Sequence, residues 1–150
     1  MSAAGLPPAR DQRTVDVKHV ELLALFHFIG AGFALLAMGG VLLHYAFFSS
    51  VMKDPEIWAR NPQAAPPQAL FEGLKWFYLA IGGWFATSLV LNVLAGFCLL
   101  RRKGRTFCFV VAAFDCLHMP IGTVLGIFTI IVLARDSVRD LFQPRAYGLE

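Results

Sequence analysis

Two long stretches of this chain carry almost no charge, and they limit what it can fold into. The first runs from about Glu21 to Ser49 and is interrupted only by His27 and His44. The second runs from about Leu74 to Leu100. A helix of about 20 apolar residues crosses the roughly 30 Å hydrocarbon core of a bilayer. Because 57% of all residues are hydrophobic and only 15% are charged, against about 25% charged in soluble domains, the sequence predicts an all-α integral membrane protein.

A third apolar segment, residues 106–134, is too short for two ideal spans and long for one. Asp115, His118 and Pro120 lie near its middle. In a single span they would sit at the bilayer centre, where an aspartate costs about 2.5–3.5 kcal/mol. Pro120 removes a backbone hydrogen bond and restricts the residue before it. We therefore expect two helices joined by a tight outer turn, over about 105–118 and 120–135, the second running on to about 142.

The basic residues predict the topology. Arg10, Arg13 and Lys18 precede the first span, Arg101–Arg105 follow the second, and Arg135, Arg139 and Arg145 follow the last. Basic residues next to membrane spans favour the cytoplasmic side. The sequence thus predicts one membrane domain over 1–150, a four-helix bundle in a bacterial inner membrane with both termini in the cytoplasm. Its spans are about 21–49, 74–100, 105–118 and 120–135, after a flexible tail over 1–14.

The long outer loop between the first two spans contains a helix start. In Asp54-Pro55-Glu56, a carboxylate can cap the helix, proline can occupy its first position and an acid lies in its first turn. A short helix at the membrane interface is expected there. Thr14 or Asp16 is the expected cap of the first long helix.

Small residues recur every four positions and predict helix packing. In lipid, helices associate where small side chains let the backbones approach closely. The spacing predicts contacts within the chain, or an oligomer interface, and Asn92 is expected to hydrogen-bond to a neighbouring helix. The candidate packing residues are Gly82, Ala86, Ser88, Asn92, Gly96, Gly122, Gly126 and Thr129.

Three polar residues form the candidate ligand or proton site. Asp115 and His118 are three positions apart, and the predicted topology puts His44 at the same outer depth. A carboxylate with imidazoles suits proton transfer or a transition metal. A hydrogen-bonded turn is the simpler interpretation. His27 lies about 25 Å along the helix from His44, and we interpret it as a satisfied or interfacial histidine.

The C-terminal part of the chain resembles a group of small uncharacterised bacterial tetraspan membrane proteins. The resemblance rests on a hairpin pattern rich in small residues, and it implies a bacterial inner-membrane protein without implying an activity. The matching residues are Cys116, Pro120-x-Gly122-Thr123-x-Leu125-Gly126-x-Phe128-Thr129, Val132-Leu133, Ser137-Val138 and Leu141-Phe142.

Three functions agree with these features. The leading hypothesis is a non-enzymatic packing, accessory or self-assembling subunit, since no nucleotide-binding loop, catalytic triad or zinc spacing is present. The alternatives are a small proton-coupled transporter or channel, and an outward-facing metal, haem or quinone redox site. The expected partners are the lipid bilayer and a homo-oligomer or membrane complex. No nucleic acid is expected, because the basic residues flank apolar spans. No cofactor is expected under the leading hypothesis, whereas the redox alternative needs a divalent metal or haem.

Overall fold

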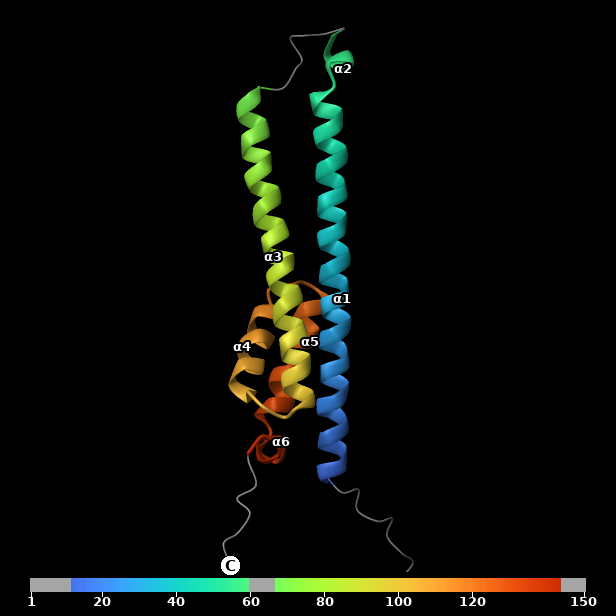
Figure 1. The fold of residues 1–150 in the computed structure, drawn as a ribbon. Coiled ribbons are helices and arrows are strands. Elements are labelled where there is room, and N and C mark those ends of the chain that lie inside the picture. Colours follow the sequence, from blue (N-terminus) through green and yellow to red (C-terminus); the bar gives the residue numbers. More distant parts are fainter. Residues whose placement is uncertain (1–11, 60–66, 144–150) are drawn as a thin grey trace, which may run out of the picture. The chain divides into compact units, whose positions relative to one another are not determined.

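The structure is a computed structural model that describes residues 12–59 and 67–143, and every regular element in these ranges is a helix (Figure 1). This confirms the all-α prediction. Residues 1–11 of the predicted flexible tail lie outside the described residues. The helices are α1 (Gln12–Lys53), α2 (Pro55–Ala59), α3 (Gln68–Leu100), α4 (Arg105–Asp115), α5 (Ile121–Ala134) and α6 (Asp136–Leu141).

The chain divides into two compact units. One unit comprises the chain up to Gly30 and from Leu91 onward. We call it the network unit, after the hydrogen-bonded network of side chains described below. The other comprises Ala31–Val90, and we call it the hairpin unit. The division follows from helix length, because the short helices α4, α5 and α6 belong to the network unit together with only one end each of α1 and α3.

All five helices of the network unit contribute to its apolar core. The largest fully buried side chains are Leu99 of α3 and Leu133 of α5, followed by residues of α1, α4 and α6. The core therefore forms where side chains from several helices contact one another, and no single helix provides it. The core cluster consists of Val20, Leu23, Ala24, Leu99, Cys108, Val132, Leu133 and Val138.

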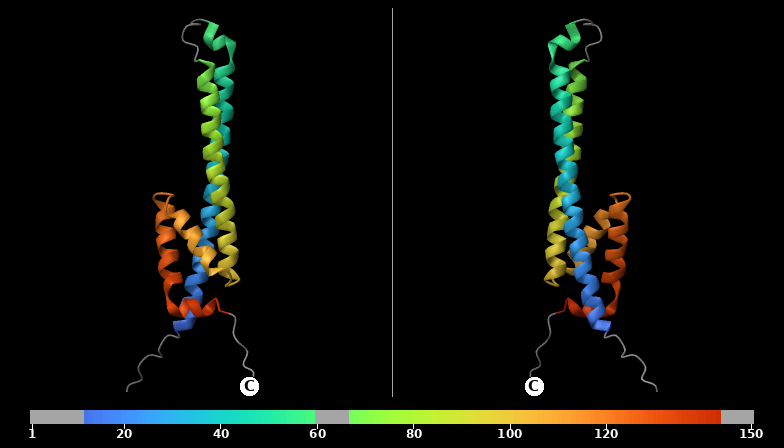
Figure 2. Two further views of the ribbon diagram at one scale, coloured as in Figure 1. Left: turned by 90° about the vertical axis from the view of Figure 1, so that its left-hand side faces the viewer. Right: turned by 90° about the vertical axis from the view of Figure 1, so that its right-hand side faces the viewer.

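Helices α4 and α5 fold back on each other through a tight turn (Figure 2). α4 ends at Asp115, three residues earlier than predicted, and α5 begins at Ile121. After α4, the backbone nitrogens of Leu117 and His118 donate hydrogen bonds to the carbonyl oxygens three positions back. Such bonds pair carbonyl groups that have no partner within the helix at its end. Pro120 cannot donate a backbone hydrogen bond and therefore opposes continuation of α4. The Met119–Pro120 peptide bond is cis.

The predicted extension of the last span to about residue 142 is replaced by a break at Arg135. This residue has extended backbone angles, φ −67° and ψ 137°, and α6 begins after it. Arg105 donates from Nε and Nη2 to the carbonyl oxygen of Leu133, at 2.9 and 2.6 Å. Arg135 Nη1 lies 3.6 Å from Oδ1 of the buried Asp16. These contacts stabilise the end of α5 from outside the helix, so the helix does not have to continue.

In the hairpin unit the adjoining parts of α1 and α3 run antiparallel, and α2 follows α1 at its far end (Figure 1). His44 and Tyr78 share a hydrogen bond of 2.5 Å between Nδ1 and the hydroxyl group, and the rings of Tyr45 and Tyr78 are 5.1 Å apart. Among its described residues, only Ala31, Ala34 and Ser88 are buried. In the described part of this unit, no large apolar side chain is buried.

The helix starts differ in how well they were predicted. α1 begins at Gln12, so Thr14 and Asp16 lie inside the helix and do not cap it. The start of α2 is as expected, since Asp54 Oδ1 accepts a hydrogen bond of 2.9 Å from the backbone nitrogen of Glu56. α1 and the Ala69–Leu100 part of α3 are each long and apolar enough to cross a membrane.

Candidate functional site

Four buried polar side chains meet inside the network unit, one from each of its four longest helices. His27 comes from α1, Asn92 from α3, Asp115 from the last position of α4 and Thr129 from α5. Each of them is at most 3% exposed. Polar groups buried this completely are costly unless they bond to one another, so their convergence indicates a specific site.

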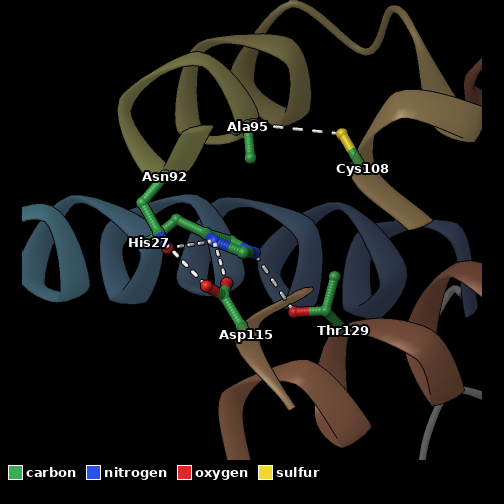
Figure 3. A network of polar contacts seen from close by, with 6 residues as sticks. All are labelled: His27, Asn92, Ala95, Cys108, Asp115 and Thr129. Carbon is green, nitrogen blue, oxygen red and sulfur yellow. Dashed lines mark hydrogen bonds and ion pairs between the residues drawn. The ribbon is translucent and has the colours of Figure 1, made fainter. Parts of the chain in front are cut away.

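Asn92 connects the histidine to the carboxylate (Figure 3). Its Nδ2 donates to Asp115 Oδ1 at 2.8 Å, and its Oδ1 lies 2.8 Å from His27 Nδ1. Because the amide uses its nitrogen on Asp115, its oxygen is the acceptor facing His27. His27 Nδ1 therefore carries a hydrogen in this arrangement.

The other contacts of the imidazole complete the network (Figure 3). Thr129 Oγ1 lies 3.3 Å from His27 Nε2, and Asp115 Oδ2 lies 3.5 Å from His27 Nδ1. That oxygen has no hydrogen-bond partner among the described residues. Imidazole and carboxylate are thus close enough to act as a charged pair, and each has a second polar partner.

Glycine lets the helices approach closely enough to build this site. A Cβ at Gly122 would lie 2.5 Å from the Asp115 carbonyl oxygen, and one at Gly126 would meet the Ala112 carbonyl oxygen and lie 2.6 Å from Cys116 Sγ. Both distances are far inside van der Waals contact, so α4 and α5 can pack this closely only with glycine at these positions. The hydroxyl group of Thr123 also donates to the Cys116 carbonyl oxygen at 2.9 Å.

The other packing candidates have different surroundings. A Cβ at Gly96 would lie 2.8 Å from the ring of Phe28, which places Gly96 in a close contact between α3 and α1. Ser88 is buried and Ala86 is half-buried. Gly82 instead has open space where a Cβ would be. The sequence predicted contacts within the chain or an oligomer interface at these positions, and for Gly82 both stay predictions.

The predicted site residues have separate partners. Asp115 bonds within the network, while His118 lies in the turn after α4 with its ring 5.2 Å from that of Phe114. His44 belongs to the hairpin unit, where it is bonded to Tyr78. The joint site of His44, Asp115 and His118 stays a prediction. Within residues 12–59 and 67–143, no three His, Cys, Asp or Glu side chains are grouped so that they could hold a metal ion.

From the sequence we interpreted His27 as a satisfied or interfacial histidine, and we did not predict that it lies at the centre of a buried polar network. A signal was present, because His27, Asn92, Asp115 and Thr129 are polar residues that lie one in each of the four predicted spans. Polar groups at membrane depth must find partners on other helices. The thiols lie outside the network: Cys98, Cys108 and Cys116 are free, and Cys108 points its sulfur toward the Ala95 carbonyl oxygen at 4.0 Å (Figure 3).

Comparison of the chain with protein families, with characterised proteins and with solved structures finds no match.

Proposed function

We propose that this chain is a non-enzymatic integral membrane protein that serves as an accessory or self-assembling subunit. The observation that carries the proposal is the exposure of the hairpin unit. Leu36, Leu43, Phe47 and Trp76 are 68–74% exposed, and no large apolar side chain is buried among the residues that the structure describes in this unit. Apolar surface on this scale marks a membrane or protein interface, and in lipid it carries no penalty.

The proposed arrangement keeps both termini in the cytoplasm of a bacterial inner membrane. α1 and α3 cross the bilayer, and α4 and α5 complete the four-helix bundle. Basic residues precede α4 and follow α5, which supports a cytoplasmic position for both ends of this second hairpin. α4 has 11 residues and α5 has 14, about 16 and 21 Å of helix. Because the hydrocarbon core is about 30 Å thick, their turn is proposed to lie inside the bilayer and not at its outer surface.

The polar groups support a subunit without catalysis. The four side chains of the network bond to one another. These bonds stabilise helix packing in lipid, where the burial of apolar groups gives no driving force. The hairpin unit offers positions for a further helix, because Gly40 and Gly82 have open space around them. Close approach of a second copy at these glycines is the proposed mode of self-assembly.

Extraction and native mass measurement test this proposal. The full chain is expected to stay in membranes washed with alkaline carbonate and to dissolve only in detergent. In mild detergent, native mass spectrometry should detect an oligomer or a complex with another membrane protein. Gly40→Leu and Gly82→Leu should reduce that assembly while leaving the helix content unchanged. Release by carbonate alone would refute the membrane assignment, and a monomer without partners would refute assembly.

A second candidate, a small proton-coupled transporter, is favoured by one observation. His27 and Asp115 form a buried pair of titratable groups 3.5 Å apart within apolar helices. Ionisable residues at membrane depth commonly mark proton or ion pathways. Purified protein in vesicles with an internal pH-sensitive dye should dissipate an imposed proton gradient if this function is correct, and empty vesicles are the control.

A further inference from the structure

We propose that His27, Asn92, Asp115 and Thr129 form a binding site for one exchangeable proton, bridged by the Asn92 amide. The proposal goes beyond the accessory role and deepens the transporter candidate by naming the groups that take up the proton. Proton binding itself requires no transport, so the two can be tested separately.

The charges around the site come from few groups. His27 faces Asp115 of α4, while α3 and α5 contribute Asn92 and Thr129, which do not titrate. Asp115 also lies close enough to His118 for an electrostatic interaction. With a neutral imidazole and an ionised Asp115, the network carries one negative charge in a fully buried place. Low polarity makes such a charge costly, so the site favours one additional proton.

The deprotonated network is already hydrogen-bonded. His27 Nδ1–H donates to Asn92 Oδ1, and Asn92 Nδ2 donates to the Asp115 carboxylate. The Thr129 hydroxyl group then donates to the unprotonated His27 Nε2. A proton added at Nε2 requires only that this hydroxyl group rotate, because Thr129 Oγ1 can accept as well as donate. The result is an imidazolium beside a carboxylate, with no net charge.

The same proton can instead rest on Asp115. A half-turn of the Asn92 amide directs its oxygen to the carboxylic acid and its nitrogen to His27 Nδ1, while His27 donates from Nε2 to Thr129. An amide suits both arrangements because it carries a donor and an acceptor on one planar group. Gly30 leaves room for the amide to turn, because a Cβ at this position would lie only 3.3 Å from Asn92 Oδ1. No apolar side chain and no carboxylate could replace Asn92 in both states.

Spectroscopy of the full chain in lipid vesicles tests the site. With nitrogen-labelled histidine, the His27 ring signals should shift with pH, and infrared difference spectra should show one carboxyl group changing with them. Asp115→Asn should abolish both changes, and His44→Gln, in the exposed part of α1, should leave both intact. About one proton per chain should be taken up by the wild type and none at this site by Asp115→Asn.

Three results would overturn the proposal. If the wild-type His27 signals and carboxyl bands stay constant at every pH at which the protein is folded, the network is a structural hydrogen-bond network that exchanges no proton. Identical His27 titration in the wild type and Asp115→Asn means that the proton is not shared with the carboxylate. Loss of both changes in His44→Gln means that the titrating site lies elsewhere. If Asp115→Asn fails to fold, the wild-type spectra are compared with those of Asn92→Leu. That variant should decouple the titration of His27 from that of the carboxyl group, and this comparison then tests the proposal. Proton binding without gradient dissipation refutes the transporter candidate alone.

Discussion

Asn92 Nδ2 donates a 2.8 Å hydrogen bond to Asp115 Oδ1 between helices α3 and α4, and its oxygen accepts from His27 on α1. One amide thus joins three helices of the network unit. In a membrane such polar contacts specify which helix faces meet, because lipid tails compete equally for every apolar face.

Replacement of Asn92 tests how much this bridge contributes to stability. Asn92→Ala leaves a buried imidazole hydrogen and a buried carboxylate oxygen without their partner, and each such loss costs about 1–3 kcal/mol. We expect a lower thermal midpoint in mild detergent, measured by circular dichroism. Thr87→Ala on the same helix is the control, because that hydroxyl group donates to the Gly83 carbonyl oxygen within its own helix. Equal midpoints for the two variants would contradict the bridge.

The α4–α5 contact should not tolerate a side chain at its glycines. Gly126→Leu forces a side chain against the Ala112 carbonyl oxygen, and overpacking of this kind costs about 1–3 kcal/mol or more. The yield of monodisperse protein in size-exclusion chromatography should fall sharply, and likewise for Gly122→Leu. Gly32→Leu, placed in open space, should retain the wild-type yield of folded chain. Normal yield from both hairpin variants would show that α4 and α5 do not pack as described.

Cysteine labelling tests the depth of the turn between α4 and α5. In a chain whose three native cysteines are replaced by alanine, Glu56→Cys should react with an impermeant maleimide from outside the cell. Arg102→Cys should react only after permeabilisation. Met119→Cys, at an 84% exposed position, should react poorly under both conditions, because the proposed arrangement puts the turn after these short helices within the hydrocarbon layer. Labelling of Met119→Cys from outside as fast as that of Glu56→Cys would instead support four complete spans.

The guanidinium cap of α5 should contribute measurably to stability. Arg105→Gln removes both donors to the Leu133 carbonyl oxygen and the cation–π contact with Phe109 at 5.1 Å. We expect a loss of about 1–2 kcal/mol, measured by chemical unfolding in detergent. Arg101→Gln, an exposed position in the same basic cluster, is the matched control and should change little. A loss of equal size in both variants would indicate a general effect of charge.

Several features of the fold were predictable because they depend on local chemistry. Pro55 and Asp54 define the start of α2 through a missing donor and a capping carboxylate. Pro120 separates two helices wherever the chain places them. The end of α5 could not be predicted in this way, because Arg105, from another helix, supplies the donors that end it.

The sequence by itself determined that the chain is helical and where its apolar segments begin and end, since hydrophobic length and proline chemistry act over a few residues. Only the tertiary structure decided that Asp115 meets His27 and Asn92. The partners of a polar side chain depend on the rotation and axial register of each helix. A uniformly apolar segment leaves both unspecified, because lipid accepts any of its faces. The rotation and register of each helix are fixed once the helices pack. Small residues such as Gly126 set how closely two helices approach, and the few buried polar groups select which faces meet.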